Sequence, residues 1–245
     1  MIADLIDIAS DMGRKLVRTE MELDEVILDD RRVRVQTVNL HHLYLALKSD
    51  SFRRVLLAAD AVTADGWPVQ LLFPRARPHR VTGSSFVERL VTIAPSLRVA
   101  IVGATSGVGE RVVQRVRGTG VSIVYREHGD RRSWLVSDLA RDIARARADL
   151  VIVAVSPPGG EEIAAALKVG LPSSSVIAVG GALDMLVGAQ VRGPRWARAI
   201  GLEWASRMLA NPRRLAKRYL LECLPVFVFG VLPAAVAMRF RVGSR

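Results

Sequence analysis

The hydrophobic pattern of the chain changes repeatedly between two periods as far as residue 181. Short apolar runs, which are typical of buried β-strands, occur at residues 33–40, 58–65, 97–104, 121–127, 148–158 and 174–181. Segments with apolar residues at helical spacing follow most of these runs, at residues 41–50, 84–94, 107–118, 135–147 and 159–170. Strands that alternate with helices predict an α/β fold, with a Rossmann-like parallel sheet and helices on both of its faces.

The C-terminal segment follows a different pattern. Residues 194–210 have the spacing of a basic amphipathic helix, and Asn211 and Pro212 form a cap and first turn for a second helix over 212–222. Residues 223–238 carry no charge, but two prolines and a glycine interrupt them. This run is shorter than the roughly 20 residues that span a bilayer. It therefore predicts either burial in the core or, as the cationic neighbours favour, shallow insertion into a membrane surface.

These patterns divide the chain into a core at residues 1–194 and a basic and apolar helical appendage at residues 195–245. The core divides in turn at about residue 95, before the regular alternation of strands and helices begins.

Positive charge is concentrated in the C-terminal segment. The formal net charge is +11, and residues 192–245 contribute +9 of it. Such a segment predicts an anionic partner, either nucleic acid, an acidic lipid surface or a phosphorylated ligand, unless it is only a solvated face. Its basic helices hold few aromatic residues that could stack on bases, so we expect no nucleic-acid partner. The single cysteine, Cys223, excludes an intrachain disulfide.

One carboxylate stands out at the predicted end of a buried strand. Asp65 closes the apolar run "AADAVTAD" and is followed by Gly66 and the bulky pair Trp67-Pro68. Functional loops of a parallel α/β sheet lie at the carboxyl ends of its strands. Asp65 is therefore a candidate functional residue, and the alternative is a simple Asp-Gly turn.

Two glycine-rich turns follow predicted strands, and the first is a candidate for nucleotide binding. Gly103, Gly107 and Gly109 lie between a predicted strand and a helix, where the backbone could approach a phosphate or ribose. This spacing is similar to that of short-chain dehydrogenases, so an NAD(P)-binding oxidoreductase is an alternative function. That class needs a Tyr-x-x-x-Lys after the glycine turn, but "YLALK" at 44–48 precedes it. The second turn, Gly180-Gly181 with Asp184, could equally be a helix cap.

The sequence offers no metal site or nucleophile for hydrolysis. It has no Asp-x-Asp, and His41 and His42 are adjacent on a predicted helix, so their side chains would point in different directions. It also lacks the Gly-x-Ser-x-Gly motif of serine hydrolases. We therefore expect no metal and no cofactor.

The motifs "TVN", "ADAVTADG", "RVTG", "VGGALDMLVGAQVRGP" and "GLEWASRML" occur in this order, followed by "NPRR". In this respect the chain resembles the WecG/TagA/CpsF glycosyltransferases, glycosyltransferase family 26, over roughly residues 35–219. The resemblance implies a Rossmann-like fold of the GT-E type and a metal-independent enzyme that inverts the anomeric centre. Such an enzyme moves a sugar from a UDP-sugar to an undecaprenyl-diphosphate-linked sugar in bacterial cell-surface polysaccharide synthesis.

The resemblance also implies where the enzyme acts and with what. It would be cytoplasmic and peripheral on the anionic inner face of the cell membrane, and a homo-oligomer is expected. N-acetylmannosamine, its uronic acid and glucose are the donor sugars among relatives. The N-terminal half of the core, about 1–95, would hold the sugars, and the half at about 96–194 would hold the nucleotide. A non-enzymatic protein that binds anionic membranes is a further alternative.

Individual residues acquire roles from the resemblance. Asp65 matches the proposed catalytic base, and the basic tail would neutralise the departing UDP in place of a metal. The residues implied to bind substrate are Thr37, Asn39, Gly66, Arg80 and Glu161. Those implied to bind the nucleotide are Gly103, Gly107, Gly109, Gly180, Gly181, Asp184, Arg207, Arg214 and Lys217, with Arg218 as the alternative to Lys217.

The chain departs from the family pattern at two positions. Ser85 stands where the family commonly has an aspartate, two residues after the glycine of "RVTG". Gly160 stands where the family has a glutamine that would touch substrate, in a turn that reads Pro158-Gly159-Gly160-Glu161. The loss of an acid and an amide predicts altered sugar recognition or reduced activity.

Overall fold

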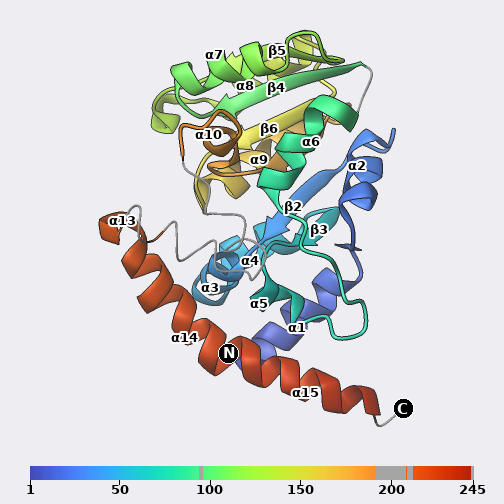
Figure 1. Ribbon diagram of the computed structural model, residues 1–245, viewed down its shortest axis with the longest axis vertical. Coiled ribbons are helices and arrows are strands. Elements are labelled where there is room, and N and C mark those ends of the chain that lie inside the picture. The colour runs from blue at the N-terminus through green and yellow to red at the C-terminus, as the bar shows by residue number, and fades with distance from the viewer. Residues whose placement is uncertain (94–95, 191–207, 209–211, 244–245) are drawn as a thin grey trace.

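A single parallel sheet forms the centre of the molecule. The computed structural model describes residues 1–93, 96–190, 208 and 212–243 (Figure 1). Its seven strands lie in the order β1-β3-β2-β7-β6-β4-β5, and all their pairings are parallel. The strands are β1 (Leu16–Val17), β2 (Arg34–Val38), β3 (Ala61–Ala64), β4 (Leu97–Gly103), β5 (Val121–Glu127), β6 (Leu150–Ala154) and β7 (Ser175–Ala178). The predicted Rossmann-like α/β fold is confirmed.

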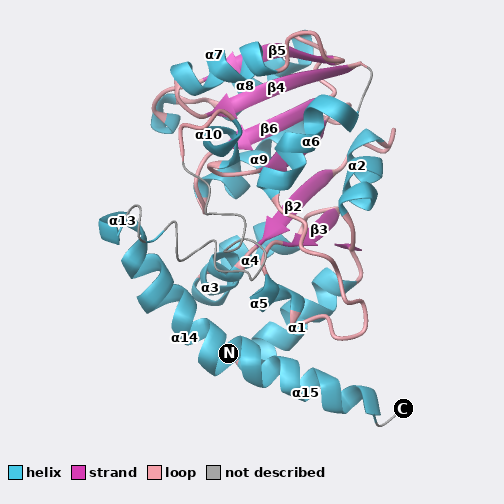
Figure 2. Ribbon diagram, in the orientation of Figure 1, coloured by secondary structure: helices cyan, strands magenta, loops and turns pink. Residues whose placement is uncertain are grey.

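Helices cover both faces of the sheet (Figure 2). The helices of the core are α1 (Ile2–Gly13), α2 (Glu20–Leu28), α3 (Leu40–Lys48), α4 (Asp50–Leu57), α5 (Trp67–Gln70), α6 (Gly83–Ile93), α7 (Ser106–Arg115), α8 (Val136–Arg145), α9 (Gly159–Gly170) and α10 (Ala182–Leu186), with a 3₁₀ turn η1 (Arg131–Ser133). One face packs against α2, α6, α7 and α10. The other packs against α1, α3 and α4 at one end and against α8 and α9 at the other.

The alternation of side chains along the strands produces these two cores. Neighbouring residues of a strand point to opposite faces of the sheet. In β6, Ile152 belongs to the core of the first face, whereas Val151 and Val153 belong to the core of the second. Both faces are buried, which explains why these strands are almost wholly apolar in sequence.

The C-terminal segment forms one long helical rod along the edge of the domain (Figure 1). It consists of α13 (Pro212–Ala216), the π-helical turns η2 (Lys217–Cys223) and η3 (Phe227–Val231), and α14 (Leu224–Val226) and α15 (Leu232–Gly243). The prediction that Pro225, Gly230 and Pro233 interrupt this segment is wrong. Each proline lies two residues after the end of a π-helical turn, and the wider turn leaves space for the ring and for the missing N–H donor.

One side of this rod packs on the domain and the other is exposed. Val226, Val231 and Ala234 join the core that contains α1 and α3. Large apolar residues are exposed along the rod, and we call them together the outer face: Leu220, Leu221, Leu224, Val228, Phe229, Leu232, Val236 and Phe240. The helix Lys217–Phe240 is long and apolar enough to cross a membrane, and an 18-residue window within it has a mean hydropathy of 2.1. The uncharged run at residues 223–238 lies within this helix.

The division of the chain into domains stays a prediction. Within the sheet, β7 lies between β2 and β6 and thereby joins the two predicted halves of the core.

Candidate active site

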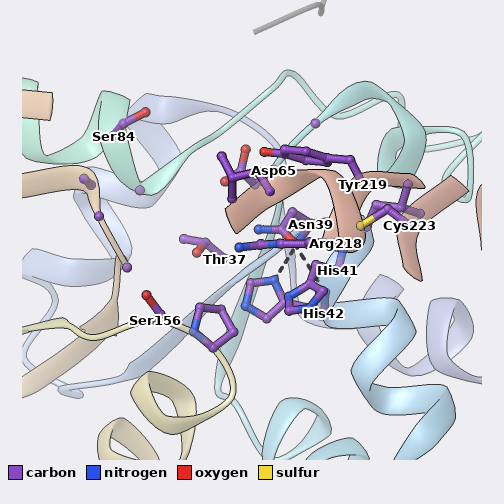
Figure 3. A pocket seen from close by; sticks show the side chains of 18 of the residues that line it. Thr37, Asn39, His41, His42, Asp65, Ser84, Ser156, Arg218, Tyr219 and Cys223 are labelled. Carbon is purple, nitrogen blue, oxygen red and sulfur yellow. Dashed lines mark hydrogen bonds between the residues drawn. The ribbon is translucent and has the colours of Figure 1, made fainter. Parts of the chain in front are cut away.

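A pocket of about 410 Å³ opens at the carboxyl ends of the strands. It lies over the junction of β2 and β7, where the two halves of the sheet meet, and this is where open α/β sheets bind ligands. The loops after β2, β3, β6 and β7 form its walls, and η2, α14 and η3 of the C-terminal rod form the remaining side. Figure 3 shows side chains from these segments converging on one space.

Asp65 enters the pocket from the end of β3. Its backbone N–H donates to the carbonyl of Val38 at 2.8 Å, which continues the pairing of β3 with β2 by one residue. Gly66 then takes a φ of 110°, which a residue with a side chain rarely adopts, and α5 begins. In Figure 3 the carboxylate lies beside the side chain of Tyr219 from the C-terminal rod. The turn therefore presents Asp65 to the pocket.

The end of β2 supplies Thr37 and Asn39. The hydroxyl of Thr37 donates to the carbonyl of Ala178 in β7 at 3.2 Å. Asn39 caps α3, because its Oδ1 accepts from the backbone N–H groups of His41 and His42 at 3.0 and 3.3 Å. The amide oxygen is thus engaged by the helix, and the NH₂ group is the part of Asn39 that remains for a ligand.

A buried pair, His42 and Glu161, lies under this cap. Nε2 of His42 and Oε1 of Glu161 are 2.9 Å apart, and both side chains are almost completely buried. Nδ1 of His42 accepts the backbone N–H of Asn39 at 3.1 Å. The proton of the neutral ring therefore sits on Nε2 and is donated to Glu161.

His41 points away from His42, as the sequence predicts, and contacts the C-terminal rod. Its Nε2 lies 3.1 Å from Oε2 of Glu222. Burial, together with the positive charge of Arg218, lowers the pKa of His41 to about 3. The ring is therefore neutral at ordinary pH and donates to Glu222, which connects α3 to the rod.

Among the described residues, Arg80 and Arg218 are the arginines that line the pocket. Lys217 is exposed and does not line it, so between these two neighbours Arg218 is the one placed at the site. Arg207 and the side chain of Arg214 lie outside the part of the chain that the structure describes.

The glycine turns separate into two groups. Gly180 and Gly181 line the pocket. Gly103, Gly107, Gly109 and Asp184 are all described, but they do not line it. A Cβ atom on Gly103 would lie 2.7 Å from the carbonyl oxygen of Ala154, so close packing against β6 already requires glycine there. The role of the first turn in nucleotide binding stays a prediction.

Both departures from the family pattern have a local structural reason. Ser85 completes the cap of α6: its N–H donates to Oγ1 of Thr82 at 2.9 Å and its hydroxyl donates to the carbonyl of Thr82 at 3.0 Å. A side chain at Gly160 would overlap with the carbonyl oxygen of Val155. Glutamine therefore does not fit this backbone, and the pocket lacks that amide.

Several residues that line the pocket were not found from the sequence. They are polar or aromatic groups from loops and from the rod: His41, His42, Ser84, Ser156, Gln190, Tyr219, Cys223 and Phe227. Trp67 and Phe227 meet edge to face at 5.0 Å and form an apolar rim. Burial raises the pKa of the Cys223 thiol to about 11, which keeps it protonated. A signal for His42 was available, since it occupies the third helical position after the Asn39 cap.

Comparison with known proteins identifies the family. The glycosyl transferase WecG/TagA/CpsF family matches residues 13–240. The chain belongs to this family. A relative from Bacillus subtilis (strain 168) is 28% identical over 185 residues, which cover 74% of this chain and 72% of the relative. A relative from Staphylococcus aureus (strain MRSA252) is 23% identical over 205 residues, 82% of this chain and 80% of the relative. Both are named N-acetylglucosaminyldiphosphoundecaprenol N-acetyl-beta-D-mannosaminyltransferase.

Membership of this family makes the chain a glycosyltransferase. This result replaces the two alternative functions that the sequence left open, an NAD(P)-binding oxidoreductase and a non-enzymatic protein that binds membranes.

Proposed function

We propose that this WecG/TagA/CpsF glycosyltransferase moves an N-acetylmannosamine-type sugar from a UDP-sugar to a sugar linked to polyprenyl diphosphate. The observation that carries the proposal is the convergence of Asp65, Thr37 and Asn39 in one pocket that also meets an exposed apolar helix. The names of the two relatives support the same transferred sugar and the same class of acceptor.

Asp65 acts as the general base in this proposal. Its carboxylate takes the proton from the attacking hydroxyl of the acceptor sugar. The hydroxyl oxygen forms a bond to the anomeric carbon of the donor while the bond from that carbon to the UDP oxygen breaks. Because one carboxylate on the acceptor side is sufficient for a single displacement, the product has the inverted anomeric configuration.

Arg80 and Arg218 stabilise the leaving group. The UDP oxygen gains negative charge as its bond to the sugar breaks, and fixed cations in a partly desolvated pocket stabilise that charge. Both guanidinium groups line the pocket that contains Asp65. We therefore propose that transfer needs no divalent metal.

The acceptor reaches the pocket along the C-terminal rod. Leu220 and Leu224 line the pocket and also belong to the outer face, where each is 48% exposed. The exposed apolar residues of the rod thus include two that also line the pocket. A lipid chain in the membrane could stay on the outer face while its sugar enters, which places the enzyme peripherally on the membrane surface.

The test is a transfer assay with the purified full chain. A panel of UDP-sugars is incubated with a short-chain lipid-diphosphate acceptor in the presence of EDTA, and released UDP and the disaccharide product are measured. We expect turnover with at least one donor, and a β-linkage by NMR from an α-linked donor. No transfer with any donor, or transfer only after a divalent metal is added, would contradict the proposal.

A further inference from the structure

Glu161 has one carboxylate oxygen that is not used within the described protein. It is the third residue of α9, lines the pocket and is only 2% exposed. Oε1 accepts from His42, but Oε2 is buried and has no hydrogen-bond partner among the described residues. A buried acceptor without a partner costs about 1–3 kcal/mol, and more when it is charged. Native structures rarely keep such an atom unless a ligand or a water satisfies it.

The surroundings of Glu161 place a hydrogen-bond donor, a helix N-terminus and a positive charge near its carboxylate. The hydrogen bond from Asn39 to Nδ1 of His42 forces Nε2 to donate, so the carboxylate accepts at Oε1. The first turn of α9 favours a negative charge. The buried guanidinium of Arg34 interacts with the charge of Glu161 as well. Oε2 is thus a fixed acceptor that requires a donor.

We propose that Oε2 of Glu161 accepts a hydrogen bond from an N–H or O–H group of the transferred sugar, and that His42 is the positioning residue for this contact. The inference rests on the proposed function and names a specificity contact of the same pocket. His42 also contacts Asn39, whose NH₂ group is free of the helix cap. The one imidazole therefore fixes an acceptor and a neighbouring donor, which together match an acetamido group or a pair of adjacent hydroxyls.

The position of Glu161 in the pocket indicates that it contacts the donor sugar and not the acceptor sugar. Glu161 is almost fully buried on the floor of the pocket, whereas Leu220 and Leu224 form its exposed rim. The lipid-linked sugar arrives over that rim, so the sugar that contacts the floor is the one that entered with the nucleotide.

Binding measurements without acceptor test the contact directly. Glu161→Gln keeps the volume and lets an amide oxygen accept from His42, but it turns an NH₂ donor towards the sugar. The probes are UDP and the UDP-sugar that the wild type turns over, both titrated by calorimetry. We expect the affinity for the UDP-sugar to fall about 10- to 100-fold, and the affinity for UDP to stay within twofold. Glu162→Gln, at the exposed neighbouring position, should bind both ligands like the wild type.

Two variants test the positioning role of His42. His42→Phe removes the donor to Oε1, and His42→Gln supplies an amide N–H in its place. We expect UDP-sugar binding to weaken strongly in the first and to recover partly in the second, with UDP binding unchanged in both. Equal loss of UDP and UDP-sugar binding would show a structural role and overturn the assignment of His42.

The failure of this inference can be told from the failure of the proposed function. Unchanged UDP-sugar binding by Glu161→Gln, with a wild type that transfers sugar, overturns the inference alone. A selective rise in KM for the lipid acceptor would also overturn it, because the contact would then belong to the acceptor sugar. A wild type without transfer or UDP-sugar binding overturns both.

Discussion

At the scale of single residues, the site is built from polar groups that end buried strands. Asp65 and Asn39 each occupy the first positions after a strand whose own residues are buried. Asn39 serves two purposes at once, because its oxygen caps α3 while its NH₂ group is left for a ligand. The same side chain therefore contributes to stability and to binding, and the two contributions can be separated by substitution.

The substitution Asn39→Asp separates the contribution of Asn39 to stability from its contribution to binding. Aspartate caps a helix about as well as asparagine, so the free energy of unfolding should change by less than about 0.5 kcal/mol. The NH₂ donor is lost and replaced by a second acceptor, so kcat/KM for transfer should fall at least about tenfold. Urea unfolding and steady-state transfer check the two halves. Asn39→Ala serves as the comparison and should lose both stability and transfer, whereas full transfer by Asn39→Asp would contradict the role of the amide.

Which site residues could be predicted depends on how far apart their partners lie in sequence. Asp65 was predictable because an apolar strand, a carboxylate and a glycine follow one another directly. The pairing of His42 with Glu161 was not predictable, because Glu161 lies in α9 and only the pairing of β2, β7 and β6 brings the two residues together. Arg218 could be named only as an alternative to Lys217. A π-helical segment changes the direction in which each side chain points, and the spacing of residues in the sequence does not reveal it.

At the scale of elements, the contact between α3 and the C-terminal rod controls the site. His41 of α3 and Glu222 of the rod form a half-buried hydrogen bond one helical turn from Arg218. This bond fixes the part of the rod that brings Arg218 and Tyr219 to the pocket. A change that weakens the contact should therefore reduce stability and also displace the cation.

The pKa of His41 makes this contact dependent on pH. In the folded protein, burial and the nearby Arg218 and His42 lower the pKa of His41 from 6.5 to about 3. The neutral ring donates a hydrogen bond to Glu222. Between these values the unfolded chain binds more protons, so the free energy of unfolding should decrease as the pH falls from 6.5 towards 3. His41→Gln keeps a donor but does not titrate.

Urea unfolding at pH 7.5 and pH 4.5 measures this effect. Between the two pH values, the wild type should lose more stability than His41→Gln, while His79→Gln at an exposed position should behave like the wild type. If acid instead stabilises the wild type relative to His41→Gln, a charged pair with Glu222 dominates and the predicted direction of the pH dependence is wrong.

The elements themselves were predictable where the pattern was long and uniform. The strands of the second half of the core and the helices after them were predicted at nearly their observed positions. The helix α4 was missed because Ser49 both ends α3 and caps α4, accepting the N–H of Phe52 at 3.2 Å, so two helices follow each other without a break. The strand β1 has two residues, too few for any periodic signal. The prediction that the prolines interrupt the rod was wrong because the π-helical turns before them have no sequence signature.

At the scale of the whole molecule, the outer face and the pocket share two residues, Leu220 and Leu224. The outer face runs along the rod from Leu220 to Phe240. Arg75, Arg77 and Arg239 lie around a groove beside its C-terminal end, which adds positive charge next to the apolar side chains. This combination favours binding in the plane of an anionic membrane.

Phe229→Glu tests the membrane face. Phe229 is 65% exposed and does not line the pocket. The proposal has the Phe229 side chain buried in the bilayer, which is worth about 1.5–3 kcal/mol. Its replacement should therefore weaken binding to anionic vesicles about tenfold or more. Transfer to an acceptor embedded in vesicles should fall in parallel, and transfer to a short-chain soluble acceptor should not. Val169→Glu on α9, at a position that is 87% exposed and outside the rod, should change neither, and equal effects of both substitutions would exclude a specific membrane face.

The proposed mechanism requires the carboxylate of Asp65 to remove the proton from the acceptor hydroxyl. Asp65→Asn keeps the size and shape of the side chain but cannot act as a base. The most direct measurement is single-turnover transfer by Asp65→Asn with saturating UDP-sugar and acceptor, beside Asp30→Asn at an exposed position. We predict that Asp65→Asn binds UDP-sugar and unfolds like the wild type but transfers sugar at least about 10²-fold more slowly. Asp30→Asn should transfer sugar at the wild-type rate. Transfer by Asp65→Asn at the wild-type rate would contradict the proposed mechanism.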